Sequence, residues 1–251
     1  MRSPSAITEA ALDGQTVAIL GGSAGIGLAV ARATVGVGGR AFLLGRDPAK
    51  LTQAVAELGL TAHAQSCDMR DASSVRAALV DVARIDHLVA TAATDESAQR
   101  APFGEISLDQ LEHSLDKLRG YIVTVQAVVA RMPPDGSITL FSGASAFRPP
   151  REGMAVLAAA NAAIAGLGRA LARELAPIRV NIIVPGVVDT GVWGDADDPR
   201  RRDLSKWAEA ALPARRMGQP EDIAAMVLLS ITNPFMTGSV LVADGGLLGA
   251  T

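Results

Sequence analysis

A run of apolar residues that breaks into glycines and then resumes as a helix constrains this chain more than any other stretch. Thr16–Leu20 is short, apolar and partly β-branched, as expected for a buried parallel strand. Glycines are dense in Gly21–Gly27, and Leu28–Val37 then has the Ala-rich pattern of a helix. Such a turn gathers backbone N–H groups and the positive helix end at one point, which suits a pyrophosphate. The pattern predicts a dinucleotide site; the alternative is an ordinary glycine-rich strand-to-helix turn.

Strands and helices alternate along the rest of the chain. Further strands are predicted at 41–44, 61–65, 86–92, 137–141, 179–184 and 239–242. Helices are predicted at 48–58, 73–82, 107–132, 155–175 and 221–229, and Ser107 and Gln110 form a capping box. Because this alternation builds parallel sheets, we expect a doubly wound α/β fold with a seven-stranded parallel sheet and helices on both faces.

The chain has 251 residues, enough for one large domain. We expect residues 1–13 to form a loose N-terminal tail and residues 14–251 to form the domain, since no linker or repeat divides them. Ligands of such folds lie beyond the carboxyl ends of the strands. The residues that follow each strand are therefore the first candidates for a site.

Composition excludes several classes of function. The formal net charge of −3 offers no broad basic field for nucleic acid. The lone Cys67 rules out an internal disulfide and fits a cytoplasmic location, and the three histidines lack metal-ligand spacing. No uncharged apolar run reaches the roughly 18 residues of a membrane span. We therefore expect no metal, no nucleic acid and no membrane partner.

Seven motifs in order carry a family resemblance. They are Gly21–Gly27, Cys67-Asp68, Asp86–Val89, Arg179-Val180-Asn181, Pro185–Thr190, Gly218–Ala224 and Thr237-Gly238 with Asp244-Gly245-Gly246. On these residues the chain resembles the short-chain dehydrogenase/reductase family over residues 13–248. The resemblance implies a Rossmann fold, a nicotinamide dinucleotide cofactor and a small-molecule substrate.

The resemblance also implies roles for residues of the cofactor site. Ser23 and Ile26 would border the phosphates, Asp68 would bind the adenine amino group, and Thr190 with the Pro185-Gly186 turn would hold the carboxamide. The full expected set is Gly21, Ser23, Ala24, Gly25, Ile26, Gly27, Arg46, Asp68, Met69, Ala92, Pro185, Gly186, Val188 and Thr190.

Arg46 bears on which cofactor is bound. An acidic residue after the second strand would bind a ribose 2′-hydroxyl, whereas this chain has Gly45-Arg46 there. A guanidinium suits a phosphate dianion, so NADP(H) is favoured over NAD(H). The alternative is that Arg46 is a solvated turn residue paired with Asp47.

The catalytic pattern of the family does not match. Its reaction uses a tyrosine with a lysine four residues later, a serine after the fifth strand and an asparagine after the fourth. Leu157 stands at the tyrosine place, Asn161 at the lysine place and Lys117 at the asparagine place. The serine place falls near Gly143, with Ser142 adjacent and Ser145 two residues on. We therefore expect a divergent member without the Tyr-x-x-x-Lys pair.

Lys117, Ser142 and Tyr121 are the candidates for a replacement catalytic set. Lys117 and the sole tyrosine, Tyr121, stand four residues apart on one helix face. A lysine in a dry pocket beside a cationic nicotinamide would serve as general acid, with Ser142 orienting the substrate. The alternative is that Lys117 is solvated or paired with Asp116 or Glu112, and that Tyr121 packs at an interface.

The predicted function is hydride transfer between NADP(H) and a small carbonyl, imine or activated alkene. The alternatives are a non-catalytic NADP(H)-binding sensor or structural protein, and a non-redox lyase or isomerase on the same scaffold. The resemblance implies a substrate lid near 191–215, and a homo-oligomer, tetramer or dimer, that pairs helices near 107–132 and 155–175.

Overall fold

One parallel sheet organises the structure. The computed structural model describes residues 11–93, 101–150, 153–195 and 197–249, and within them the strand order is β3-β2-β1-β4-β5-β6-β7. The strands are β1 Thr16–Leu20, β2 Arg40–Gly45, β3 Ala62–Ser66, β4 His87–Ala90, β5 Ser137–Phe141, β6 Arg179–Pro185 and β7 Val240–Ala243. All neighbouring strands are parallel, which confirms the predicted fold class.

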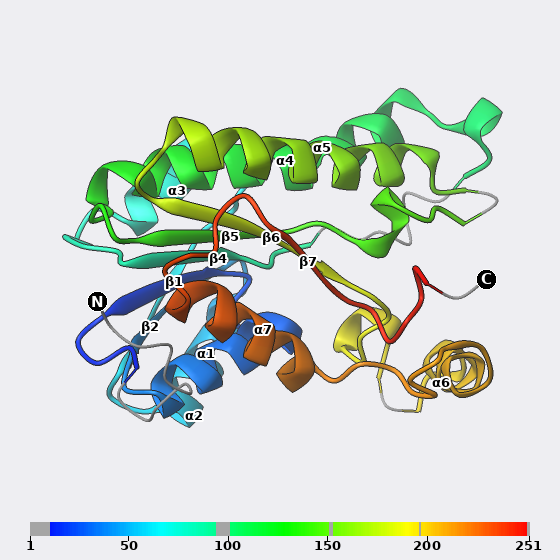
Figure 1. Cartoon of the computed structure of the whole chain (residues 1–251), viewed down its shortest axis with the longest axis horizontal. Coiled ribbons are helices and arrows are strands. Elements are labelled where there is room, and N and C mark those ends of the chain that lie inside the picture. Colours follow the sequence, from blue (N-terminus) through cyan, green and yellow to red (C-terminus); the bar gives the residue numbers. More distant parts are fainter. Residues whose placement is uncertain (1–10, 94–100, 151–152, 196, 250–251) are drawn as a thin grey trace.

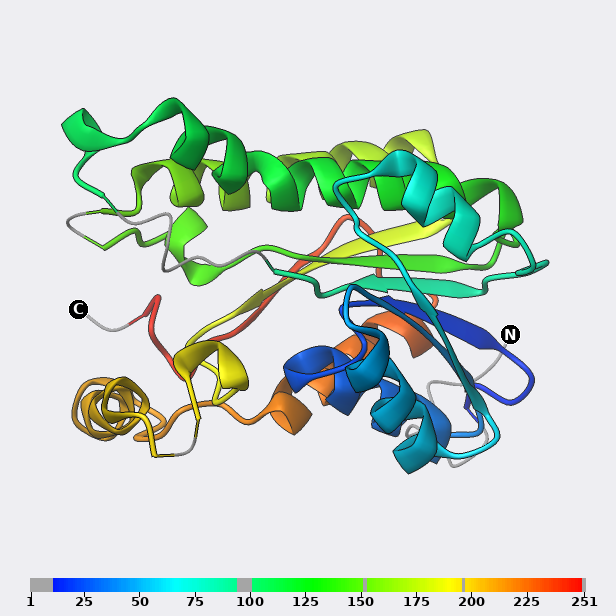
Figure 2. The same ribbon diagram turned by 180° about the vertical axis from the view of Figure 1, so that it is seen from behind.

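Helices cover both faces of this sheet. Figure 1 shows α3, α4 and α5 on one face and α1, α2 and α7 on the other, and Figure 2 shows the same layers from behind. The helices are α1 Gly25–Gly36, α2 Pro48–Leu58, α3 Ala72–Ala78, α4 Leu108–Val128, α5 Ala155–Glu174, α6 Pro199–Ala211 and α7 Pro220–Thr232. Short 3-10 turns are η1 Phe103–Glu105, η2 Val129–Arg131, η3 Ala144–Ala146 and η4 Gly191–Trp193.

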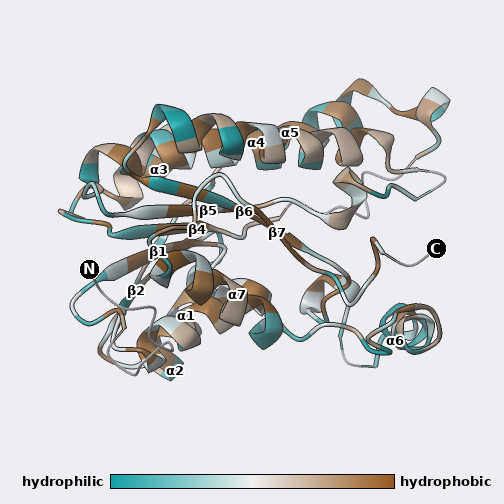
Figure 3. Ribbon diagram, in the orientation of Figure 1, coloured by the Kyte–Doolittle hydropathy of each residue, from teal (hydrophilic) through white to brown (hydrophobic). Residues whose placement is uncertain are grey.

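The core lies between the sheet and these two helical layers. The strands β4 and β5 are buried along their whole length, as expected where helices cover both faces. Figure 3 shows hydrophobic residues along the central strands and hydrophilic ones on outer turns of α5. Within the described residues α5 alone has the length and hydropathy of a membrane span. It packs against α4, β5 and β6 as a layer helix.

Two expectations about the chain need correction. Leu12, placed in the loose tail, is buried, and its N–H donates to the carbonyl of Val37; residues 1–10 lie outside the described part. The segment 199–211, part of the expected lid and given no helix from the sequence, is helix α6. Asp198 caps it and Pro199 occupies its first turn, a start signal that was legible in the sequence.

Most other boundaries agree within a few residues. The largest differences are at the ends of α4, predicted to reach residue 132 but ending at Val128, and of α3, predicted to reach residue 82 but ending at Ala78. The helix gives way there because the N–H groups of Leu79, Val80 and Val82 make short turn hydrogen bonds instead. The predicted capping box of Ser107 and Gln110 is confirmed.

The sheet reverses its direction of winding between β1 and β4. The N–H groups of Thr91 and Ala92 both donate to the carbonyl of Leu20, which brings the carboxyl ends of the two strands together. Gly21 sits in this junction with φ of 87°, and a Cβ there would lie 2.8 Å from the Cα of Ala92. A crevice at such a reversal point is where ligands of open α/β sheets bind.

A buried histidine lies at the amino-terminal end of the central strand β4, away from the crevice. His87 Nδ1 is 2.8 Å from Ser137 Oγ, and Nε2 is 2.7 Å from Gln15 Oε1. Burial and the positive charge of Arg179 lower the pKa of His87 to about 4. The imidazole is therefore neutral in the folded protein at neutral pH.

We predict that His87 contributes to acid destabilisation. In the unfolded chain the imidazole is protonated below its ordinary pKa of 6.5, whereas in the folded protein it is protonated only below about pH 4. Unfolding free energy therefore falls by up to about 3 kcal/mol as pH drops through this window. Denaturant titrations at pH 7, 6, 5 and 4 should show a smaller loss for His87→Gln than for the parent. Equal losses would contradict the prediction, because the carboxylates titrate in both proteins.

We also predict that two glycines of α1 tolerate alanine very differently. A Cβ at Gly27 would lie 2.1 Å from the carbonyl oxygen of Gly21, whereas one at Gly36 meets nothing within 4 Å. Gly27→Ala should lower the unfolding free energy by roughly 2 kcal/mol or more. The matched control Gly36→Ala should be neutral or add up to about 1 kcal/mol. Chemical denaturation measures both, and similar effects would show that the close approach is not real.

Candidate functional site

A cleft of about 980 Å³ opens beyond the carboxyl ends of β1, β2, β3 and β4. The glycine-rich turn forms one wall, and residues after the neighbouring strands form the rest. Eleven of the predicted cofactor residues line it: Gly21, Ser23, Ala24, Gly25, Ile26, Gly27, Arg46, Asp68, Met69, Ala92 and Thr190. Residues from five separate parts of the sequence thus converge on one space.

The start of α1 is open to an anion. Its N-cap residue, Ala24, makes no side-chain capping hydrogen bond, and the first turn carries no acidic residue. By contrast, Asp47 caps α2 and Ser107 caps α4 with side-chain oxygens. The backbone N–H groups and the positive dipole end of α1 therefore face the cleft, and no capping side chain of the N-cap residue competes for them.

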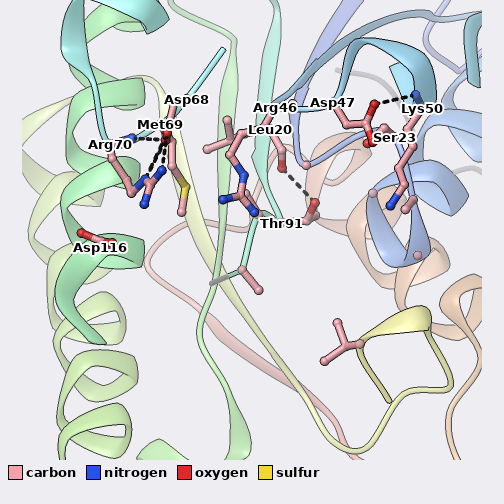
Figure 4. Close-up of a pocket in the computed structure, with 18 of the residues that line it drawn as sticks. Leu20, Ser23, Arg46, Asp47, Lys50, Asp68, Met69, Arg70, Thr91 and Asp116 are labelled. Carbon is pink, nitrogen blue, oxygen red and sulfur yellow. Dashed lines mark hydrogen bonds and ion pairs between the residues drawn. The ribbon is translucent and has the colours of Figure 1, made fainter. Parts of the chain in front are cut away.

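Two basic side chains reach the cleft from the segment that follows β2. Figure 4 shows Arg46 and Lys50 near Ser23 and Asp47. The carboxylate of Asp47 accepts hydrogen bonds from the N–H groups of Ala49 and Lys50 at the start of α2. Within the described residues no ion pair joins Arg46 to Asp47, so the alternative pairing is not what the structure shows.

An ion pair occupies the far end of the cleft. Asp68 accepts from Arg70 through both carboxylate oxygens, with Nη2 at 2.6 Å from Oδ2 (Figure 4). The Arg70 guanidinium lowers the pKa of Asp68, with a smaller contribution from Arg46, so the carboxylate stays ionised. Asp116 on α4 lies on the same side of the cleft and acts electrostatically on Arg70. Sequence reasoning missed Arg70 and Lys50, although each follows a predicted residue closely.

Three of the predicted cofactor residues are not among the described residues that line this cleft. Pro185 is the last residue of β6, and Gly186 and Val188 lie between it and Thr190. Gly186 packs against the end of β7, where a Cβ would lie 2.6 Å from the Cα of Asp244. Val188 is buried, and its carbonyl accepts from Trp193 Nε1 at 2.8 Å. These residues lead along the chain to Thr190, which does line the cleft.

The predicted catalytic residues lie together beside the cleft, in a buried cluster. Lys117 is only 5% exposed, so the expectation of a solvated lysine is wrong. Its Nζ donates to Asn161 Oδ1 at 3.1 Å and to the Ser142 carbonyl at 3.4 Å. The amine also lies 5.9 Å from the centre of the Tyr121 ring.

Ser142 and Tyr121 have structural partners within this cluster. The Ser142 hydroxyl donates to the carbonyl of Asn161 at 2.7 Å, so its oxygen lone pairs are what it can offer to another group. Tyr121 is fully buried, and its hydroxyl donates to the carbonyl of Ala92 at 3.0 Å. The alternative that Tyr121 packs at an interface is therefore wrong. Through Ala92 the cluster adjoins the cleft.

Leu157 and Asn161, the residues expected at the two positions of the family pair, are both buried on α5. Leu157 is 2% exposed and belongs to the apolar face of the helix. Asn161, also 2% exposed, donates from Nδ2 to Ser145 Oγ at 3.0 Å. Sequence reasoning gave Asn161 no role of its own, and Ser145 was noted only as a neighbour of the expected serine position.

The expected lid region carries an ion pair next to the cleft. Arg201 on α6 donates to Asp189 at 2.6 Å, and Asp189 precedes the cleft residue Thr190. Trp193 packs with Leu204, Leu212 and Met217 in a small cluster of its own.

The helix faces expected at a subunit interface are only partly available. Ala165 is buried inside the protomer against Ile182 and Val184, so that residue cannot pair across subunits. Ala162 on the same helix is exposed. Among the residues that the structure describes, no three His, Cys, Asp or Glu side chains are grouped as a metal site.

Comparisons with known proteins match the whole site region. The family model described as enoyl-(acyl carrier protein) reductase matches residues 21–248. The short-chain dehydrogenase/reductase malC of Malbranchea aurantiaca is 29% identical, covering 94% of this chain and 96% of the relative. The cyclic-di-GMP-binding biofilm dispersal mediator protein of Escherichia coli K12 is 32% identical, covering 94% and 98%.

Solved structures also resemble this chain over nearly its whole length. The MalC reductase/Diels-Alderase superposes with a TM-score of 0.87 at 28% identity, covering 96% of this chain and 98% of that one. A blue fluorescent protein from a metagenomic library, solved in complex with NADPH, gives a TM-score of 0.82 at 31% identity, covering 94% and 98%. By fold, strand order and sequence over nearly its whole length, this chain belongs to the short-chain dehydrogenase/reductase family.

Proposed function

We propose that this chain is an oxidoreductase that binds NADP(H) in the cleft and transfers a hydride to or from a small carbonyl, imine or activated alkene. The single observation that carries the proposal is the cleft itself. It combines the N-terminus of α1, which has no side-chain cap, with close-packed glycines and the cations Arg46 and Lys50 at the carboxyl ends of the strands. The NADPH complex of a structural neighbour supports the choice of cofactor.

The residues present fit this cofactor. The amides at the start of α1 would hold the diphosphate, because they offer hydrogen-bond donors and positive partial charge. Arg46 and Lys50 would hold the 2′-phosphate, and Asp68 would accept from the adenine amino group beside Arg70. Thr190 would bind the carboxamide, held in place by the Pro185-Gly186 turn and Val188.

Lys117 is proposed to handle the proton. When bound, NADPH supplies the hydride to the substrate carbon. The Lys117 ammonium would donate a proton to the substrate oxygen or nitrogen that gains electrons, and the neutral amine would take it back in the reverse reaction. The sole tyrosine, Tyr121, has Val125 four residues on, so the chain contains no Tyr-x-x-x-Lys pair to do this.

Ser142 and Tyr121 are proposed to assist. The Ser142 oxygen can accept a hydrogen bond from a substrate hydroxyl or N–H, because its own proton is held by Asn161. Tyr121 would shield the Lys117 amine with its ring and fix the cleft wall through Ala92. The segment near 191–215 would close over the substrate, in a protein that works in the cytoplasm as a homo-oligomer.

We predict that Arg46 selects the phosphorylated cofactor. Arg46→Ala should weaken NADPH binding about 10- to 100-fold, the loss of one charge-assisted contact, and leave NADH binding nearly unchanged. Calorimetric titration with both cofactors measures this. Arg76→Ala, an exposed arginine of α3 that is not among the described lining residues, is the control. Equal affinities for the two cofactors in the parent protein would contradict the proposal.

We further predict that Lys117 is needed for turnover but not for cofactor binding. Lys117→Met keeps the length of the side chain and should lower kcat about 10²- to 10⁴-fold, the usual contribution of a general acid. NADPH affinity should change only a few-fold. The measurement is NADPH consumption against a panel of carbonyls, imines and activated alkenes. Unchanged turnover would remove Lys117 from the mechanism, and tight binding with no turnover on any substrate would indicate a non-catalytic binding protein.

A further inference from the structure

Asn161, in the N-terminal half of α5, makes three hydrogen bonds, two of them buried and one part-buried. Its Oδ1 accepts from Lys117 Nζ at 3.1 Å, and its Nδ2 donates to Ser145 Oγ at 3.0 Å. Its main-chain carbonyl accepts from Ser142 Oγ at 2.7 Å. One residue therefore ties α4 and the loop after β5 to α5.

The orientation of the Asn161 amide follows from this arrangement. An ammonium has only donors, so the group facing Lys117 must be the carbonyl oxygen of the amide. Turning the amide over would set its NH₂ against the ammonium and would leave a buried donor unmatched. The Lys117 contact and the Ser145 contact thus fix the same side-chain torsion.

The Asn161 side chain packs closely against the backbone of Gly143. A Cβ at Gly143 would lie 2.9 Å from Asn161 Nδ2, closer than side chains pack. Gly143 therefore leaves just the room that the amide occupies between Ser142 and Ser145. The amide has little space to move without moving the loop.

Lys117 needs such a fixed acceptor. A lysine side chain loses about 1.5–2 kcal/mol of rotamer entropy when it is held in one orientation. Its amine is buried and so must find hydrogen-bond acceptors inside the protein. Asn161 Oδ1 is the nearer of its two acceptors described above, since the Ser142 carbonyl lies at 3.4 Å.

We infer that Asn161 is a positioning residue, which sets where the Lys117 amine lies and keeps it beside the cleft wall. Asn161 itself need not touch substrate or cofactor. The catalytic consequence rests on the proposed function, in which Lys117 exchanges a proton with the substrate. The coupling between the two side chains does not, because it exists in the protein without ligands.

A thermal-stability cycle tests the coupling without cofactor or substrate. Asn161→Leu leaves the Lys117 amine buried without its nearer acceptor and should lower Tm by roughly 5 °C or more. Adding Lys117→Met removes the buried amine that has lost its acceptor. The Tm of the double variant should therefore fall by clearly less than the sum of the two single decreases in Tm.

A second buried asparagine provides the matched control. Asn181 on β6 bonds the Met236 carbonyl and the Ser239 N–H, remote from the Lys117 contacts. Asn181→Leu combined with Lys117→Met should therefore give additive losses. Additivity in the Asn161 cycle as well would overturn the inference.

Kinetics separate positioning from simple loss of stability. Below the melting temperature, Asn161→Leu should lower kcat at least 10-fold while the dissociation constant of NADPH changes only a few-fold. Asn161→Asp keeps an oxygen facing the amine and should recover most of kcat, with the pH profile moved because a carboxylate now faces Lys117. In the Lys117→Met background, Asn161→Leu should cause no further loss of kcat.

The outcomes of these experiments test the positioning role of Asn161 separately from the proposed function. Normal kcat in Asn161→Leu, in a protein where Lys117→Met has lost activity, overturns the positioning role alone. No turnover in the parent protein on any substrate contradicts the proposed function, and the stability cycle then decides the inference by itself.

Discussion

The close approach of β1 and β4 at their carboxyl ends is the constraint on which the rest of the site depends. Leu20 offers one carbonyl to the N–H groups of both Thr91 and Ala92, and the Thr91 hydroxyl donates to it as well at 2.9 Å. Only a residue without Cβ fits at Gly21, in the space left between the two strand ends. With the turn held there, α1 starts beside the ends of the neighbouring strands, and the cleft follows from that placement.

Charge is distributed unevenly around this cleft. One side of the cleft has Arg46 and Lys50, which are exposed, and the opposite end has the Asp68–Arg70 pair. Beyond Ala92 the polar groups are buried: Lys117, Ser142 and Asn161 face one another rather than solvent. The first region suits recognition of a charged ligand, while the second suits control of a single proton.

The fold was predictable from the sequence because its signals are local and repeated. Buried strands such as Thr16–Leu20 and the capping box at Ser107 depend on neighbouring residues, and the order of motifs indicated the family. Helix α6 was missed although Asp198 and Pro199 mark its start. The predicted cofactor residues that line the cleft lie at or after the ends of predicted strands, so topology alone brings them together.

The buried cluster could not be predicted in the same way. Sequence register placed Asn161 and Lys117 at family positions, but nothing local shows that residues 44 apart share a hydrogen bond. Burial of Lys117 depends on α4 and α5 packing side by side, which is a property of the tertiary structure. Leu12 shows the same limit at a smaller scale, since its partner Val37 lies across α1.

The hydrogen bond from Tyr121 to Ala92 has a consequence for the evolution of substrate choice. It joins α4, which carries Lys117, to the end of β4 that borders the cleft. A change of shape on that side would therefore disturb the Lys117 cluster and the cleft wall at once. The part of the wall formed by Gly191 and Val192 shares none of the hydrogen bonds described for this cluster, so a change of shape there would leave the cluster in place.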